Sequence, residues 1–262
     1  GNMGYKLIDV KNGVISLEEF VAQLTDDELE TITRGGLEGM YSPRGIAGNA
    51  GVFGGTSDSL LEKGVPPICT NDGPSGIRLQ AHSTLLPIGI GLACTFDDEL
   101  IEELLYHLSL EMIERKSHTL LAPGMNIHRT PLCGRNFEYF SEDPYLSGKI
   151  GAAYIKGVQR TGIFATPKHF CCNNQETKRL VHDSRVSCRA LREIYWKGFE
   201  IALKEAKPQC LMMSYNKVNG VYSYYNYDLG TTLLRDEWNY EGVIMTDWWM
   251  KDGVSSDFEN IT

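Results

Sequence analysis

The chain has 262 residues, of which 42% are hydrophobic and 23% charged, a composition typical of a globular protein with a sizeable buried core. No stretch approaches the roughly 20 uninterrupted apolar residues of a membrane-spanning helix, so we expect no membrane partner. The formal net charge of -9 disfavours a nucleic-acid partner, because phosphate binding requires clustered Lys and Arg.

Residues 15–34 predict one or two short amphipathic helices, with Ser16 and Thr25 as N-caps. We therefore expect an N-terminal helical lead-in over residues 1–34. The glycine-rich stretch from residue 35 to residue 64 is interpreted as a loop that moves or lies against a ligand.

Beyond this loop, short apolar runs alternate with helical patterns, which predicts a parallel α/β fold. Because the runs are apolar throughout, we expect strands that are covered on both faces. In the helical segment 188–206, apolar residues recur every fourth position, at Leu191, Tyr195, Phe199 and Leu203. The other helices are expected at 97–116, 143–161 and 229–239. The strand runs are Val65–Cys69, Leu120–Met125, Ile163–Pro167, Cys210–Met213 and Val243–Met245.

The ends of these runs favour a closed barrel over an open sheet. Each run ends in polar residues, and no GxGxxG loop follows a strand. We therefore predict a TIM-like (β/α)8 barrel over residues 35–262. Only five runs are clear, which is short of eight, so the barrel is expected to be incomplete at its C-terminal end.

The seven cysteines are irregularly spaced and form no CxxC pair of the kind that zinc and redox sites use. We interpret them as reduced thiols of a cytoplasmic protein, with a secreted protein carrying one spare thiol as the alternative. The histidines do not fall at metal-ligand spacing, and no HExxH, DxDxDG or P-loop pattern occurs. We expect neither a metal nor a cofactor.

Asp247 is the sharpest candidate for chemistry, because it ends an apolar run and precedes Trp248-Trp249. A carboxylate beside aromatic rings suits a sugar, although an Asp in this position also caps helices. Lys168 and His169 follow another run. Lys168 is either a Schiff-base nucleophile or a donor to hydroxyls, and His169 is a ligand, a donor or a core histidine.

Two glycine-containing turns carry further candidates. Asp72 and Arg78, in the segment NDGPSGIR, either bind vicinal hydroxyls or bind each other and hold the loop. Arg135, in the segment GRNFE, is either a ligand clamp or one half of an ion pair with Glu138 or Glu142.

Five motifs in a fixed order closely resemble the barrel domain of glycoside hydrolase family 3, from about residue 15 to residue 252. They are NDGPSGIR, APGMNIHRTPLCGRNFEYFSEDP, TPKHFCCNNQET, MMSYNKVNG and GVIMTDWW. The resemblance implies a retaining, exo-acting β-glycosidase that removes terminal β-D-glucosyl residues through a covalent glycosyl-aspartate.

The resemblance also implies residue roles, and it weakens the Schiff-base interpretation of Lys168. Asp247 lies on the motif of the nucleophile, and Asp72 on that of a residue that holds sugar hydroxyls. Tyr215 resembles the phenol near the nucleophile, and Met212 resembles a residue of the pocket wall. The remaining substrate-binding residues implied are Arg78, Arg135, Lys168, His169 and Trp248.

The acid/base residue has no clear match, and Glu138, Glu142 and Glu176 are the local candidates. Many family members supply this residue from an α/β-sandwich domain, which this chain lacks. The segment DVKNGVISLEEFVAQLT resembles members in which that domain precedes the barrel, so we expect the acid/base to come from outside this chain. The alternatives are a non-hydrolytic sugar-binding fragment, a β-xylosidase and a β-N-acetylglucosaminidase; a homo-oligomer is also compatible.

Overall fold

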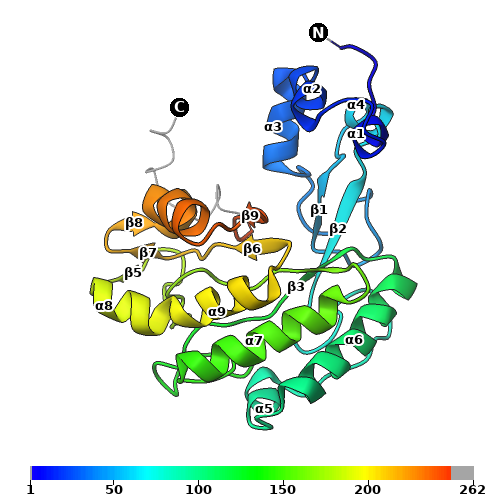
Figure 1. Ribbon diagram of the computed structural model, residues 1–262. Helices are drawn as coiled ribbons and strands as arrows, with labels where there is room; N and C mark the ends of the chain where they lie inside the picture. Colours follow the sequence, from blue (N-terminus) through cyan, green and yellow to red (C-terminus); the bar gives the residue numbers. More distant parts are fainter. Residues whose placement is uncertain (1, 249–262) are drawn as a thin grey trace.

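The fold is built on parallel strands that follow one another in chain order (Figure 1). The computed structural model describes residues 2–248. β2 (Pro67–Asp72), β3 (Thr119–Leu121) and β4 (Phe164–Ala165) pair side by side, and β6 (Cys210–Met212) pairs with β9 (Val243–Met245). The segment after β4 joins the two groups, because Pro167 and Phe170 bond the backbone N–H and the carbonyl oxygen of Met212. The order of the parallel strands is therefore β2, β3, β4, β6 and β9.

Long helices cover the outer face of these strands (Figure 1). They are α6 (Asp98–Arg115), α7 (Pro144–Gln159) and α9 (Lys197–Ala206), and α7 packs on both of the others. Asp97 and Asp143 cap α6 and α7, and each side chain accepts a hydrogen bond from a first-turn N–H. The predicted bounds of α6 and α7 are confirmed to within two residues.

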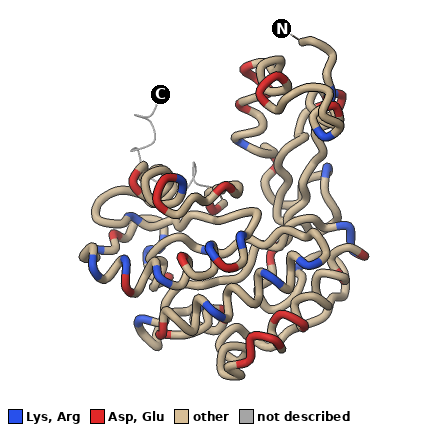
Figure 2. The backbone as a smooth tube through the Cα atoms, in the orientation of Figure 1, with Lys and Arg blue, Asp and Glu red and all other residues tan. Residues whose placement is uncertain are grey.

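The predicted helix over residues 188–206 consists of three consecutive segments, α8 (Cys188–Ala190), the wider-turned η1 (Leu191–Tyr195) and α9. Its apolar stripe is confirmed, because Leu191, Phe199 and Leu203 are buried and Tyr195 packs against the core. Figure 2 shows acidic and basic positions interspersed along the outer helices. Ion pairs join α7 to its neighbours, Lys149 with Glu205 on α9 and Arg160 with Glu103 on α6.

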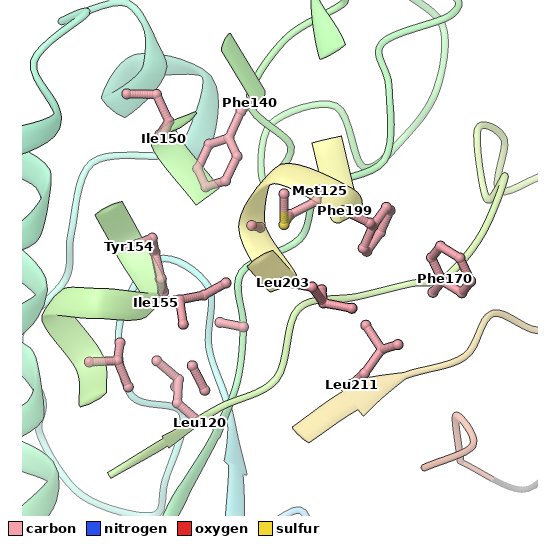
Figure 3. Close-up of a cluster of buried hydrophobic side chains, with 14 of the residues drawn as sticks. Leu120, Met125, Phe140, Ile150, Tyr154, Ile155, Phe170, Phe199, Leu203 and Leu211 are labelled. Carbon is pink, nitrogen blue, oxygen red and sulfur yellow. The ribbon is translucent and has the colours of Figure 1, made fainter. Parts of the chain in front are cut away.

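The hydrophobic core lies between this helical layer and the strands (Figure 3). Each fully buried large apolar side chain contributes about 1.5–3 kcal/mol relative to an exposed one, so the layer holds the strand ends in place. The labelled core residues are Leu120, Met125, Phe140, Ile150, Tyr154, Ile155, Phe170, Phe199, Leu203 and Leu211.

The N-terminal helices stand at the far end of an arm made by β1 (Gly51–Gly54) and β2 (Figure 1). They are α1 (Leu7–Lys11), α2 (Leu17–Ala22), α3 (Asp26–Arg34) and α4 (Asp58–Glu62). Ser16 and Thr25 are confirmed as N-caps, and each accepts a hydrogen bond from the N–H three residues later.

The prediction of a loop throughout residues 35–64 is wrong in part, because this stretch contains β1 and α4. β1 runs antiparallel to β2. A Cβ at Gly55 would lie 1.9 Å from the carbonyl oxygen of Val65, so this glycine serves close approach of two backbones.

Several short elements were not predicted. α5 (Gly89–Ala93) precedes α6, and η2 (Ser223–Tyr225) leads into η3 (Asp228–Glu237), the helix expected at 229–239. A separate small sheet pairs β5 (Asp183–Ser184), β7 (Lys217–Val218) and β8 (Val221–Tyr222). None of the helices in the described part of the chain is long and apolar enough to cross a membrane.

The strands do not close into a barrel within residues 2–248, and the expected incompleteness at the C-terminal end of the barrel stays a prediction. The antiparallel β1 covers the free edge of β2, and no ladder joins β9 to β1 among these residues. A side chain makes the connection instead, because Trp248 Nε1 donates to the carbonyl oxygen of Ala50. The chain just after β9 therefore lies next to the start of β1.

Candidate active site

The polar residues that follow the parallel strands meet in one place. Asp72 ends β2, Lys168 and His169 follow β4, and Asp247 follows β9. Lys168 Nζ lies 2.8 Å from Asp72 Oδ1, and His169 Nε2 lies 3.8 Å from Asp247 Oδ2. The C-terminal ends of parallel strands share one edge, and this is where barrel enzymes place their active sites.

The Asp72–Arg78 turn is closed by its own hydrogen bonds. Arg78 N donates to the Asp72 carbonyl oxygen at 2.9 Å, and the Arg78 guanidinium lies 3.5 Å from Asp72 Oδ2. Gly73 has φ 131°, and a Cβ there would collide with the oxygen of Gly76 at 1.7 Å. The two residues therefore hold the loop together, yet the Arg78 side chain is 69% exposed and remains open to a ligand.

Asp72 also borders a pocket on the side of the N-terminal loop. The residues lining it are Met40, Tyr41, Gly48, Ala50, Asp72, Arg78, Leu79 and Gln80. Tyr41 is an exposed aromatic residue in the left-handed region at φ 62°, which is uncommon for a tyrosine. The buried side chain of Asn49 braces this loop by bonding the backbone of Ser42 and Ile46.

Asp72 is an ionised acceptor. Burial favours its neutral form, but the charge and hydrogen bond of Lys168, together with Arg78, outweigh burial and lower the pKa of Asp72 below its usual value. Its oxygens therefore accept hydrogen bonds and donate none.

Asp247 is in a different electrostatic environment. Its carboxylate is 13% exposed and accepts a 2.8 Å hydrogen bond from Trp248 N. Burial outweighs this bond and the nearby cations Lys168, Arg135 and Arg179, so the pKa of Asp247 is raised.

One wall of the site consists of Tyr215, Met212 and Trp248. The Tyr215 hydroxyl donates to the Trp248 carbonyl oxygen at 2.6 Å, and burial and the charge of Asp247 raise the pKa of this phenol. Met212 is buried in a small cluster with Ala50 and Leu121, and Trp248 packs against this cluster. Trp249 lies outside the described residues.

His169 is held from two sides. The side-chain amide of Asn126 bonds both the N–H and the carbonyl oxygen of His169, at 3.0 and 2.9 Å. The Tyr139 hydroxyl lies 3.3 Å from His169 Nδ1. Burial, Arg135 and Lys168 lower the pKa of His169 well below its usual value, so the ring is neutral. His169 is therefore a buried histidine whose ring also faces Asp247, so the core-histidine interpretation does not exclude the interpretation as a ligand.

Arg135 lies between two glutamates. Its Nε donates to Glu138 at 2.7 Å, and its guanidinium lies 3.9 Å from Glu176. The alternative pairing with Glu142 is wrong, because Glu142 is exposed and takes no part in this network. Glu176 also pairs with Arg179 at 3.0 Å.

These ion pairs bear on the acid/base residue. A proton donor needs a carboxyl group that is free to face the leaving group, whereas the carboxylate oxygens of Glu138 and Glu176 accept hydrogen bonds from arginine. Glu138 and Glu176 are therefore poorly suited to protonate a leaving group. Between residues 2 and 248, no cluster of three or more His, Cys, Asp or Glu side chains is arranged to hold a metal ion.

The structure brings every predicted site residue to this region and adds four that were missed. Asn126 had a signal, because it ends a predicted apolar run. Tyr139 and Asn173 lie within the quoted family motifs but were not singled out there, and Arg179 lies outside those motifs. The added residues are Asn126, Tyr139, Asn173 and Arg179.

An α/β scaffold with polar residues collected at the ends of successive parallel strands defines a TIM-barrel-like enzyme domain. Comparison with known proteins supports this class. Residues 23–259 match the Glycosyl hydrolase family 3 N terminal domain. The chain belongs to glycoside hydrolase family 3.

Similar proteins are β-glucosidases and a related glycosidase. The chain is 51% identical to a Ruminococcus albus β-glucosidase over 95% of its own length and 26% of the relative. It is 44% identical to an exo-α-(1→6)-L-arabinopyranosidase of Bifidobacterium longum, over 71% of the chain and 26% of the relative. The chain therefore spans about a quarter of these relatives.

Solved structures of β-glucosidases are also similar to this chain. The crystal structure of a Paenibacillus barengoltzii β-glucosidase is 52% identical and superposes with a TM-score of 0.94, over 99% of this chain and 29% of that one. β-Glucosidase 3B of Thermotoga neapolitana in complex with glucose is 44% identical, with a TM-score of 0.82 over 88% of this chain and 33% of that one.

Proposed function

We propose that this chain carries the nucleophile and the sugar-binding half of a retaining, exo-acting β-glucosidase. One observation carries the proposal: Asp247 is a nearly buried carboxylate that shares a site with His169 and with the Lys168–Asp72 pair. The names of the similar proteins support β-glucosides as the substrate class.

Asp247 attacks the anomeric carbon of the terminal sugar in this mechanism. The bond to the leaving oxygen breaks as the carboxylate oxygen bonds to carbon, and a covalent glycosyl-aspartate results. The Trp248 N–H fixes Asp247 Oδ1 and leaves Oδ2 available on the side of His169. Charge that develops on the sugar ring is stabilised by the carboxylate beneath it.

The charged residues around Asp247 bind sugar hydroxyls. Asp72 accepts hydrogen bonds, whereas Lys168, Arg135 and Arg78 donate them, so hydroxyls of one stereochemistry find partners. A hydroxyl that points elsewhere leaves a buried group unpaired at a cost of about 1–3 kcal/mol. These residues therefore select the sugar as well as orient it.

We further propose that the acid/base residue and the rest of the barrel lie outside these residues. The ion pairs of Glu138 and Glu176 with Arg135 support this, since a retaining enzyme needs a second carboxyl group, about 5–5.5 Å from the first, that is free to face the leaving group. The greater length of the relatives and the five parallel strands between residues 2 and 248 support it too.

Mechanism-based labelling tests the proposal on the chain itself. A 2-deoxy-2-fluoro-β-glucoside with a dinitrophenolate leaving group needs little proton donation. We expect one glycosyl adduct, located by peptide mass on Asp247. Asp247→Asn should give no adduct, and Asp228→Asn, on an outer helix, should label as the wild type does. An adduct on another residue ends the proposal.

A second candidate is a sugar-binding chain that does not hydrolyse. The paired state of Glu138 and Glu176 favours it for the chain on its own. It predicts glucose binding by calorimetry without turnover of either dinitrophenyl or alkyl glucosides. Parallel assays with β-xylosides, β-N-acetylglucosaminides and α-L-arabinopyranosides decide the sugar.

A further inference from the structure

Tyr139 is a buried tyrosine between two site residues, and the proposed function assigns it no role. It is 0% exposed, and its hydroxyl lies 3.3 Å from His169 Nδ1 and 3.2 Å from Asn173 Nδ2. A neutral imidazole carries its proton on one nitrogen, and the partner of the other nitrogen decides which one.

The orientation of Asn173 is fixed by a carboxylate. Asn173 Nδ2 donates to Glu176 Oε1 at 3.3 Å, and Arg179 donates to the other carboxylate oxygen of Glu176 at 3.0 Å. Both Glu176 oxygens are acceptors in these bonds, so the amide nitrogen must face the carboxylate; a flipped amide would set two acceptors against each other. The same nitrogen then donates its second hydrogen to the Tyr139 oxygen.

The direction of the remaining bond follows. The Tyr139 oxygen already accepts from Asn173, so its own O–H is directed to His169 Nδ1. If Nδ1 carried a proton, the Tyr139 hydroxyl hydrogen would lose this acceptor and stay buried, at a cost of about 1–3 kcal/mol. Nδ1 is therefore an acceptor, and the proton of the neutral ring lies on Nε2, facing Asp247 across 3.8 Å.

We propose that Tyr139 is a positioning residue that fixes His169 as the Nε2–H tautomer, through the relay Glu176–Asn173–Tyr139–His169. His169 then acts as a hydrogen-bond donor beside Asp247. It does not take a proton from water or from a hydroxyl at Nε2, so it is excluded as the general base. This inference deepens the proposed function and rests on it for its catalytic meaning.

The tautomer of His169 can be measured by NMR, without any assay of enzymatic activity. Selective 15N labelling of histidine and long-range proton–nitrogen spectra separate an unprotonated from a protonated ring nitrogen, and the pattern lost in His169→Gln identifies the residue. We expect an unprotonated Nδ1 and a protonated Nε2 in the wild type. A protonated Nδ1 overturns the proposal, and this holds even if the variants below do not fold.

Tyr139→Phe removes the hydroxyl and keeps the ring. We expect the His169 nitrogens to shift toward a mixture of tautomers, and the rate of labelling at Asp247 to fall about five- to tenfold, the loss of about one hydrogen bond. Tyr154→Phe is the matched control, because Tyr154 is equally buried and its hydroxyl donates to Pro74 instead. Its His169 pattern should match the wild type. An equal shift in both variants, or in neither, refutes the relay.

The two proposals fail separately. If no adduct forms but His169 has the expected tautomer, the glucosidase mechanism is wrong and the relay stands. If Asp247 is labelled but Nδ1 is protonated, the relay is wrong and the mechanism stands.

Discussion

Replacing Lys168 with Met should destabilise the chain far more than the same change at Lys149. Both lysines lie close to a carboxylate, 2.8 Å for Lys168–Asp72 and 2.7 Å for Lys149–Glu205, but the side chains are 4% and 33% exposed. Removing one partner of a buried pair costs about 3–5 kcal/mol because the other charge stays buried. An exposed pair contributes about 0–1 kcal/mol.

Two features reduce the expected loss at Lys168. Asp72 is 30% exposed, and Arg78 remains 3.5 Å from its other oxygen, so we expect a loss in unfolding free energy of about 2–3 kcal/mol. Lys149→Met should cost about 0.5 kcal/mol. Urea unfolding of both variants at pH 7 measures the difference. Equal losses would refute the argument that burial, rather than distance, sets the strength of these pairs.

The pH dependence gives a second check on the same variant. Lys168 lowers the pKa of Asp72 below 3.8, so Asp72 stabilises the wild type above pH 3.8, and this contribution is lost as the pH falls through its native pKa. Without Lys168, burial dominates and disfavours the ionised form at neutral pH. The gap between wild type and Lys168→Met should therefore be largest near pH 7 and narrow as the pH falls toward 3.8 and below. A constant gap would contradict this assignment.

Three further variants test other parts of the site. Asp247→Asn should raise the thermal unfolding midpoint at pH 7, because burial raises the pKa of Asp247 and the ionised form therefore destabilises the fold above that pKa; an unchanged or lower midpoint contradicts this. Asn126→Ala removes both bonds to the His169 backbone and should lower the unfolding free energy by about 2–3 kcal/mol in urea. Tyr41→Ala should weaken glucose binding in calorimetry without moving the urea midpoint, since its exposed ring lines the pocket beside Asp72; unchanged affinity would remove it from the site.

The regular part of the fold was predictable because its signals are local. The apolar runs predicted β2, β3, β4, β6 and β9. The helical patterns, including the apolar residues at every fourth position, predicted the helices that cover these strands. β1 was missed because its glycines resemble those of a loop, and only the structure shows that Gly55 allows a close backbone contact with Val65. The two-residue strands β7 and β8 are too short to give a periodic signal.

In the site, too, the residues with a local signal were predicted and the contacts between distant segments were not. Asp72, Lys168, His169 and Asp247 were found because each follows a strand, and parallel strands end at one edge. Local sequence gave no sign of the pairs between distant segments. Arg135 meets Glu176 across 41 positions, and Tyr139 meets His169 across 30. Each of these residues lies in a recognisable motif, but the contact between two motifs arises from packing and is not encoded in either one.

The distribution of ion pairs is consistent with the proposed mechanism. Each of the three central cations already has a carboxylate: Lys168 has Asp72, Arg135 has Glu138 and Arg179 has Glu176.

Asp247, by contrast, has no cation paired directly with it among the described residues. It faces the neutral ring of His169 and accepts a hydrogen bond from the Trp248 N–H. A buried anion without a direct counter-charge is costly in the free enzyme. In the proposed mechanism, a sugar ring that gains positive charge as its glycosidic bond breaks supplies this counter-charge at that moment. The attraction is then stronger in the transition state than in the ground state, which is the condition for acceleration rather than for tighter substrate binding alone.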